Sequence, residues 1–530
     1  MITTEGLSLA YGRRVLFESV SVKLTPGNCY GLIGANGAGK SSFLKILAGE
    51  IEPSAGKVSV PKGLRMSVLK QDHYAFDEVT ALDTVIMGHH HLHELMRAKD
   101  ALYAKPDFND DDGLRVSELE AEFTDLGGWD AETNAAQLLS SLGIATEQHR
   151  RLMKELSGNE KVRVLLAQAL FGDPEILLMD EPTNHLDVAS ILWLEEFLAE
   201  FKNTVVVVSH DRHFLNNVCT NIADIDFQKV QLYTGNYEFW YESSQLALKQ
   251  SREQNKKTED KMKELQEFVR RFSANASKSR QATSRKKVLE KLDLAEIKPS
   301  SRKYPHIIFR DMKELGKDVL TVTGLAKALE QPLLDKVSFN VGRGEKVAVV
   351  GDDQAVSVLL RTLAGEDKPD KGEVRWGQSV ALGYMPSDNA RYFNSQLNLI
   401  DWLRQYSEEQ SENFIRTYLG RMLFSGEESL KPVSVLSGGE RVRCMLAKAM
   451  LLAPNVLLLD QPTGHLDLES ITALNDALIA YQGTVIFGSH DVQFAQSLAT
   501  RVVEVTPTRF TDLAMSYDEY MDRTKAAQQS

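Results

Sequence analysis

An internal repeat constrains the fold of this chain more than any other feature of its sequence. Three motifs recur at an offset of 280 residues: L-S-G-N-E at 156–160 returns as L-S-G-G-E at 436–440, L-M-D-E-P-T-N-H-L-D at 178–187 returns as L-L-D-Q-P-T-G-H-L-D at 458–467, and S-H-D at 209–211 returns at 489–491. Self-similarity of this extent indicates homologous structural units. The sequence therefore predicts two related domains, at 1–243 and 305–530, joined by a linker at 244–304.

The first half carries an insertion. Its L-A-G-E at 47–50 matches 363–366 at an offset of 316, so it holds about 36 extra residues (316 minus 280) upstream of Ser157. They fall within about 88–130, where helical runs near 89–103 and 114–126 flank a turn at 106–113. This pattern predicts an inserted αα-hairpin. His89 and His93 could share a helix face as zinc ligands do, but no cysteine or second ligand pair is nearby, which favours a solvated face.

Residues 34–41 read G-x-x-x-x-G-K-S, which predicts a phosphate-binding P-loop between a β-type run at 29–33 and a helical run at 42–47. Glycines let successive backbone N–H groups point at phosphate oxygens, and the N-terminus of the following helix favours anions. The Lys40 ammonium suits the β- and γ-phosphates, and the Ser41 hydroxyl suits Mg²⁺. The expected nucleotide ligands are Gly34, Asn36, Gly37, Gly39, Lys40, Ser41 and Ser42.

Two carboxylates stand at the end of the apolar strand predicted at 176–179. Mg²⁺ prefers one or two carboxylates together with water and phosphate oxygens, so Asp180 is expected to share the ion with Ser41. Glu181 suits a general base or water-positioning residue, because hydrolysis must activate a water opposite the leaving group.

Composition limits the classes of protein that fit. A formal net charge of −13 over 530 residues argues against a uniformly basic nucleic-acid binder. Cys29, Cys219 and Cys444 stand in mostly apolar surroundings and are expected to be buried thiols in a reducing compartment. No signal peptide and no apolar run long enough to span a membrane is evident, so we expect a cytoplasmic protein without a membrane partner.

Together, the P-loop, the L-S-G-G-E motif, the strand ending in Asp-Glu and the later S-H-D resemble an ABC-type ATPase cassette. Two cassettes with no membrane domain, a helical insertion in the first and a charged helical linker resemble the ABC-F family of translation factors. The resemblance implies an α/β fold of two tandem P-loop ATPase domains joined by an α-helical hairpin linker. It also implies that the insertion, called the arm, reaches ribosomal protein and rRNA near the E site, and that the linker probes the P-site tRNA.

The resemblance assigns further roles. It implies that Gln71 senses the metal and the γ-phosphate, that His210 contacts the γ-phosphate, and that Tyr11 stacks on adenine, although a tyrosine there also suits surface packing. Catalytic residues are then Glu181, His210 and Gln71, and Gln71 joins Ser41 and Asp180 at the metal. Family cassettes pair head to tail, so the intact P-loop is expected to face Ser437, Gly438, Gly439 and Glu440 of the second half.

The second half departs from this pattern. Residues 351–358 stand where its P-loop belongs, one residue short and without a lysine, and Asp352 and Asp353 bring negative charge where phosphates would sit. Ser387, Gln461 and Leu329 replace the glutamine, the glutamate and the tyrosine, and Asp460 and His490 are expected to serve structure. The facing signature of the first half has Asn159 in place of its second glycine. The defects therefore fall in one composite site, which we expect to be catalytically inactive.

The linker is basic although the chain is acidic. Residues 245–303 hold 17 Lys and Arg against 8 Asp and Glu, a net charge of +9, which leaves −22 for the rest. A one-sign tip on an acidic protein fits binding to a phosphate backbone better than a solvated charged helix, in which opposite charges usually alternate. The expected RNA-contacting residues are Arg270, Arg271, Lys278, Arg280, Arg285, Lys286 and Lys287.

We therefore expect a monomeric, ribosome-binding ATPase that uses ATP and Mg²⁺ and hydrolyses slowly until a ribosome stimulates it. In this reading ATP closes the two cassettes around one competent site, and hydrolysis through Glu181 releases the factor. Two alternatives remain open: an ATPase subunit of a transporter, against which the basic linker argues, and a non-hydrolysing scaffold whose shape ATP fixes, against which the intact Glu181 argues.

Overall fold

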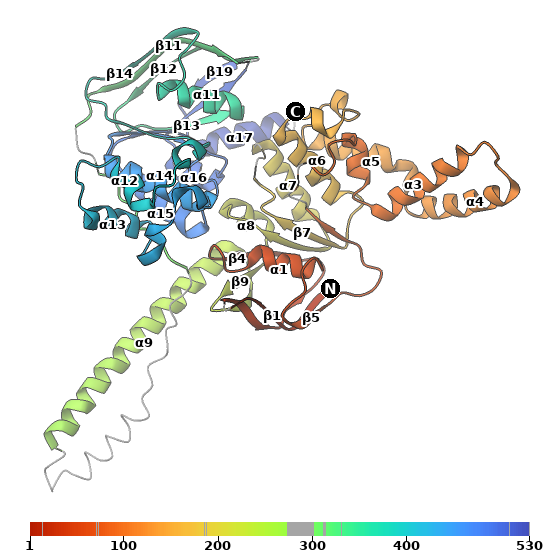
Figure 1. Ribbon diagram of the computed structural model, residues 1–530, viewed down its shortest axis with the longest axis horizontal. Coiled ribbons are helices and arrows are strands. Elements are labelled where there is room, and N and C mark those ends of the chain that lie inside the picture. The colour runs from red at the N-terminus through yellow and green to blue at the C-terminus, as the bar shows by residue number, and fades with distance from the viewer. Residues whose placement is uncertain are drawn as a thin grey trace.

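Two α/β cassettes of the same topology make up most of the molecule (Figure 1). The computed structural model describes residues 1–12, 14–69, 72, 74–184, 186, 188–272, 302–310, 314–329, 331–507 and 509–528. The first cassette holds a six-stranded sheet of order β10-β9-β4-β8-β7-β6, and the second holds β19-β18-β13-β17-β16-β15. Equivalent strands occupy equivalent places, which confirms the predicted fold class.

The strands of both large sheets follow from apolar runs. β7, β8, β16 and β17 are buried along nearly their whole length, as expected of parallel strands that helices cover on both faces. The strands of the two large sheets are β4 (Cys29–Gly34), β6 (Met66–Val68), β7 (Ile176–Asp180), β8 (Thr204–Val208), β9 (Asn221–Asp226), β10 (Lys229–Thr234), β13 (Lys346–Gly351), β15 (Leu382–Met385), β16 (Val456–Asp460), β17 (Thr484–Gly488), β18 (Arg501–Thr506) and β19 (Arg509–Leu513).

A smaller antiparallel sheet completes each cassette and packs beside its P-loop helix. The first contains β1 (Ile2–Tyr11), β2 (Arg14–Val20), β3 (Lys23–Leu24) and β5 (Ala55–Ser59), and the second contains β11 (Asp318–Ala328), β12 (Pro332–Gly342) and β14 (Lys371–Trp376). The principal helices of the cassettes are α1 (Lys40–Leu47), α2 (Ala81–Ile86), α5 (Ala131–Ser141), α6 (Gly158–Leu170), α7 (Val188–Glu200), α8 (Arg212–Val218), α11 (Asp353–Leu363), α12 (Leu399–Arg404), α13 (Glu412–Arg421), α14 (Gly438–Leu452), α15 (Leu468–Ala480), α16 (Val492–Leu498) and α17 (Tyr517–Gln528).

The inserted hairpin projects from the first cassette as α3 (His90–Tyr103) and α4 (Asp110–Asp125) (Figure 1). The predicted start of the second helix, near residue 114, was wrong by about a turn. Asn109 caps α4 in a capping box with Asp112, and carboxylates in a first turn suit the positive end of the helix dipole. Within the part of the chain that the structure describes, no group of three or more potential metal ligands is found, and His89 caps α3.

The linker begins with α9 (Tyr237–Phe272), a helix of 36 residues that starts inside the first cassette (Figure 1). At about 1.5 Å per residue it extends about 54 Å. Its root is anchored by Tyr237 and Trp240, which are 7% and 5% exposed. Among the described residues, no helix combines the length and the apolar character needed to cross a membrane.

Hydrophobic contacts join the two cassettes. Leu468 of the second cassette belongs to the buried cluster of the first, and Leu192 of the first belongs to the buried cluster of the second. A buried leucine contributes roughly 2 kcal/mol, so these two side chains favour the paired arrangement. Cys29, Cys219 and Cys444 are buried free thiols, as expected, and the Sγ atoms of the first two lie 3.9 Å apart.

Candidate functional site: a composite site between two cassettes

The P-loop joins the end of β4 to α1, as its motif predicts. Gly34 must be glycine because a Cβ there would lie 2.7 Å from the carbonyl oxygen of Ile225 on β9. Lys40 Nζ donates to the carbonyl oxygens of Gly34 at 2.8 Å and Ala35 at 3.5 Å, so its ammonium lies across the loop. The loop and the N-terminus of α1 therefore bring together an ammonium and backbone N–H groups, which are the groups that bind phosphates.

Lys40 lies in an acidic setting. Its side chain is buried, which lowers its pKa, while Glu181, Glu469, Asp467 and Asp180 oppose that shift. Two of these four carboxylates come from the other cassette. The protein thus keeps an ammonium out of water by surrounding it with acids, and a polyanionic ligand would take over part of that role.

Glu181 and His210 form the centre of the site. The backbone N–H of His210 donates to Glu181 Oε2 at 3.2 Å, and His210 Nε2 lies 3.5 Å from Oε1. Glu181 adopts a left-handed backbone with φ of 53° and donates its N–H to Val208 at 2.8 Å, which turns its side chain across the end of the sheet. Strain of this kind in a glutamate persists only where the surroundings fix it.

Burial sets the protonation of both side chains. It raises the pKa of Glu181 to about 8, with the charge of Asp180 as the second cause. It also lowers the pKa of His210 to about 3, helped by Lys40, so the imidazole is neutral at physiological pH. A carboxyl group with a pKa near the working pH is suited to exchange a proton with water.

Ser41 and Asp180 offer the donor set that Mg²⁺ prefers, a hydroxyl and a carboxylate beside phosphate oxygens. The repeat supports this fit. Ser357 and Asp460 are their counterparts in the second cassette, and there Ser357 Oγ donates to Asp460 Oδ2 at 2.8 Å. The fold therefore brings these two positions together. A magnesium ion there would neutralise phosphate charge.

The second cassette presents its signature motif to this P-loop. A Cβ at Gly439 would lie 2.6 Å from the carbonyl oxygen of His465 and 3.7 Å from Asn36 Nδ2. Gly439 is thus a close-approach position beside the P-loop of the other cassette. Ser437 caps α14, and its N–H donates to Glu440 Oε2 at 2.9 Å in a capping box. The Glu440 carboxylate is thereby engaged in holding the helix start.

The remaining predicted residues are less central. Tyr11 ends β1 and is 55% exposed. Gln71 lies outside the described residues, as do Lys278, Arg280, Arg285, Lys286 and Lys287. Arg270 and Arg271 belong to the last turn of α9. Gly37 is exposed on the loop, and Ser41 is exposed and Ser42 half-buried in the first turn of α1.

Comparison with known proteins decides the family. The profile of the ABC transporter family matches residues 17–184 and 334–464, and a second ABC transporter profile matches residues 223–309. An uncharacterized ABC transporter ATP-binding protein, YkpA of Bacillus subtilis (strain 168), is 59% identical over 526 residues, which cover 98% of this chain and 97% of YkpA. The probable ATP-binding protein YbiT of Escherichia coli O157:H7 is 46% identical over 524 residues, covering 98% and 99%. This chain belongs to the ABC-F family of ABC ATPases.

Solved structures share the tandem fold of this ABC-F protein. The RNase-L inhibitor matches with a TM-score of 0.62 at 19% identity and covers 99% of this chain and 93% of its own. The archaeal ribosome recycling factor aABCE1, solved with the ribosomal stalk protein aP1, matches with a TM-score of 0.61 at 18% identity, covering 98% and 92%. At these identities the likeness establishes the fold alone.

The second composite site of this ABC-F protein is built differently. Gly351 occupies the place of Gly34, since a Cβ there would lie 2.1 Å from the carbonyl oxygen of Val505, the counterpart of Ile225. After Gly351 the second cassette continues directly into helix α11, whereas the first cassette continues into the P-loop. α11 has 11 residues against 8 in α1, and Asp352 caps it by accepting from the Ala355 N–H at 2.9 Å. The helix N-terminus is thus satisfied by the chain's own carboxylate.

Side chains also fill the positions expected for phosphate and metal. Asp353 Oδ1 lies 3.0 Å from His490 Nε2, and its Oδ2 accepts from Asn159 Nδ2 of the first cassette at 3.0 Å. Asp460 Oδ2 accepts from the hydroxyls of Ser357 at 2.8 Å and Ser387 at 2.7 Å. The residues that depart from the family pattern therefore contact one another across the interface between the cassettes.

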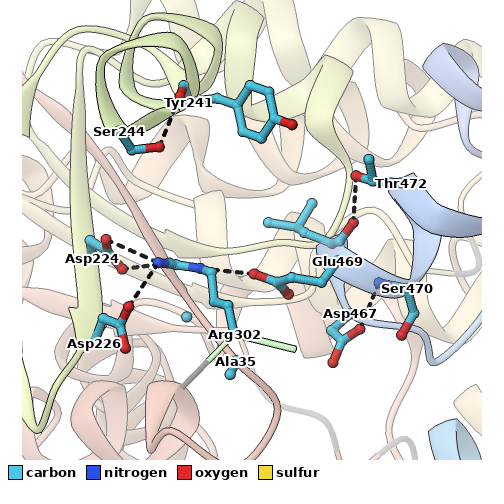
Figure 2. Close-up of polar contacts among 12 residues, drawn as sticks. Ala35, Asp224, Asp226, Tyr241, Ser244, Arg302, Asp467, Glu469, Ser470 and Thr472 are labelled. Atoms are coloured by element: carbon cyan, nitrogen blue, oxygen red, sulfur yellow. Dashed lines mark hydrogen bonds and ion pairs between the residues drawn. The ribbon is translucent and has the colours of Figure 1, made fainter. Parts of the chain in front are cut away.

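Sequence reasoning missed several residues near the first site. Arg14 donates from Nη2 to the carbonyl oxygen of Gly37 at 2.8 Å and so supports the P-loop. Arg302 of the linker binds carboxylates of both cassettes (Figure 2). No local motif marks these arginines. The pairing of Asn159 with Asp353 had a signal, because a glycine is lost and an acid is gained at positions that face each other in head-to-tail cassettes.

Proposed function

We propose that this protein is a ribosome-binding translation factor of ABC-F type with one working ATP site. ATP binds between the P-loop of the first cassette and the signature of the second, and it holds the two closed. Hydrolysis releases the factor. The observation that carries this proposal is the segregation of features: the Lys40 loop faces Gly439, whereas the second site is filled by Asp353 and its partners.

The chain's own residues divide the chemistry of the first site. Lys40 and the backbone N–H groups of the P-loop bind phosphate oxygens, and Tyr11 stacks on adenine at the rim. Glu181 positions the attacking water and accepts its proton, since its carboxylate stands at the end of β7 and faces His210. Neutral His210 donates a hydrogen bond toward the γ-phosphate. Ser41, Asp180 and Gln71 would hold Mg²⁺, and Ser437, Gly438 and Gly439 close over the nucleotide.

The linker carries the ribosome contact. α9 ends about 54 Å from its start, well clear of both cassettes, and Arg270 and Arg271 belong to its last turn (Figure 1). A tip of one charge sign binds a phosphate backbone with high affinity and little base specificity. We therefore assign rRNA and the P-site tRNA to the linker, and the E-site region to the α3–α4 arm.

The Glu181→Gln variant tests this function, because it removes the base and keeps the size of the side chain. In co-sedimentation with ribosomes it should be retained with ATP and released without it. Gln461→Ala, at the equivalent position of the second site, is the matched control and should behave like the wild type. Absence of ribosome binding by Glu181→Gln in both conditions would overturn the translation-factor proposal.

A second arm tests the linker. Glutamine at Lys278, Arg280, Arg285, Lys286 and Lys287 in the Glu181→Gln background should weaken retention and flatten its salt dependence, since each lost phosphate contact lowers the slope by roughly one. Retention with unchanged salt dependence would remove RNA contact from the linker. Co-purification of an integral membrane protein would favour the transporter alternative, and absence of phosphate release with ribosomes would favour the scaffold.

A further inference from the structure

Arg302, at the C-terminal end of the linker segment, forms a junction between both cassettes (Figure 2). Its Nη2 pairs with Asp224 Oδ1 at 2.5 Å and its Nη1 with Asp226 Oδ2 at 3.4 Å, both on β9 of the first cassette. Its Nε pairs with Glu469 Oε1 at 2.8 Å, on α15 of the second cassette. One guanidinium therefore bridges the two cassettes directly.

The same guanidinium also fixes the root of the linker. It lies 4.7 Å from the centre of the Trp240 ring, in the first turn of α9, so the two ends of the linker segment meet at this point. Planar guanidinium groups suit this combination of a bidentate carboxylate contact and an aromatic face, and a lysine cannot reproduce it.

The charged side chains of this junction are buried. The side chain of Arg302 is 10% exposed, and those of Asp224 and Asp226 are 9% and Glu469 is 5%. Burial raises the pKa of Asp224 and of Glu469 and Arg302 opposes both shifts, while Asp224 leads the groups that raise the pKa of Arg302 itself. Without the arginine, three buried carboxylates would lose the cation that they share, which is costly.

Both ends of the junction lead to the first nucleotide site. Asp224 stands beside Ile33 in the β9–β4 pairing, directly before the P-loop. Glu469 lies in the first turn of α15, next to its cap Asp467, and both carboxylates act on Lys40. Arg302 is thus in contact with the structures that hold Lys40 from both sides.

We propose that Arg302 is a positioning residue that couples closure of the first nucleotide site to the orientation of the linker. This inference rests on the proposed function. In the closed arrangement the Arg302–Glu469 pair holds α15 against β9 while the Trp240 contact fixes the root of α9. ATP-driven closure therefore fixes the linker in one orientation, and occupancy of the linker by a partner favours closure in return, as linkage requires.

The test measures linker orientation and hydrolysis separately. Lys256→Cys on α9 and Glu427→Cys in the second cassette, both exposed, accept spin labels selectively because the three native cysteines are buried. In a Glu181→Gln background, ATP should narrow the distance distribution between the labels. Arg302→Gln should abolish this narrowing. In the Glu181-intact protein, Arg302→Gln should raise the KM for ATP about tenfold and change kcat less than threefold, since an ion pair of the closed state is lost.

Matched variants separate coupling from simple stability. Arg501→Gln removes an arginine that pairs with Glu345 and Asp512 inside the second cassette, and it should keep ATP-dependent narrowing and KM. Glu469→Gln removes only the second-cassette partner and should reproduce Arg302→Gln, with no further effect in the double variant. Arg302→Lys should restore part of the narrowing at most.

Two outcomes would overturn the inference, and they are distinguishable. If ATP narrows the distance distribution in Arg302→Gln and in Glu469→Gln as it does in Arg501→Gln, the first site closes without the Arg302–Glu469 pair. If ATP does not narrow the distance distribution in the Glu181→Gln background, and the Glu181-intact protein does not hydrolyse ATP, then the proposed function fails and the coupling fails with it.

Discussion

The two composite sites share a backbone and differ in what fills it. Glu181 and Gln461 both have left-handed φ values, 53° and 49°, and both donate their N–H to the neighbouring strand, at 2.8 and 2.9 Å. Each side chain accepts the N–H of the following histidine, His210 or His490, at 3.2 Å. The two sites thus share one backbone frame, because sheet register and close packing set it.

Several groups of the second site are paired with protein atoms. A helix turn replaces the P-loop, Asp353 links His490 to Asn159, and serine hydroxyls bind Asp460. A buried polar site that lost its ligand would leave groups unsatisfied, so substitutions that pair them internally are favoured.

Loss of the base should produce the largest contrast. Glu181→Gln is expected to lower the ATPase kcat by about a hundredfold or more, since general base catalysis contributes roughly 10²–10⁴. Gln461→Ala should change kcat less than about twofold. Steady-state phosphate release measures both, and equal losses in the two sites would break the comparison.

Close approach should give the next largest contrast. Gly439→Ala places a Cβ 2.6 Å from the His465 carbonyl oxygen, whereas Gly158→Ala, at the signature of the filled site, meets nothing within 4 Å. Both changes raise helix propensity by up to about 1 kcal/mol, which makes them matched. Gly439→Ala should raise the ATP concentration for half-maximal hydrolysis about tenfold, because relief of this contact within the second cassette shifts the signature backbone away from the P-loop, and a loss of about 1.4 kcal/mol in closure corresponds to tenfold. Gly158→Ala should leave it unchanged.

A smaller effect is expected at the filled site itself. Asp353→Ala removes the link between His490 and Asn159 and should weaken cassette pairing by about 1 kcal/mol, equivalent to about a fivefold higher ATP requirement for closure. Asp367→Ala is the control, because its side chain is 30% exposed, near the 35% of Asp353, and its partner Arg361 lies in the same cassette. ATP titration of cassette closure by small-angle scattering would measure it. An unchanged midpoint for Asp353→Ala would mean that the filling does not support pairing.

The smallest effect should come from partial repair. Gln461→Glu restores the missing carboxylate in the second site. In the Glu181→Gln background it should add no measurable ATPase activity, because α11 and Asp353 still occupy the phosphate position. Recovered hydrolysis would show that the second site retains a nucleotide pocket.

Much of the fold and the first site could be predicted because the signals are local. The P-loop motif places Lys40 and Ser41 by itself, and the strand before Asp180 carries its apolar run in the sequence. The repeat gave the two cassettes, and the structure repeats the strand order in both. The start of α4 was misjudged, because three aspartates suit a turn as well as the first turn of a helix.

The rest could not be predicted because it depends on residues far apart in the sequence. Asn159 and Asp353 contact each other only once two cassettes have paired, and Arg302 meets Asp224 and Glu469 through tertiary structure alone. A one-sequence pattern can suggest that a site has lost its chemistry. It cannot show that the missing ligand has been replaced by side chains, because this requires distances.

The number of nucleotides bound per chain tests the difference between the two sites most directly. Equilibrium dialysis of the Glu181→Gln variant with ATP and Mg²⁺ should give one tightly bound nucleotide per chain, and Lys40→Ala should abolish it. Two tightly bound nucleotides per chain, or one that survives Lys40→Ala, would contradict a single working site.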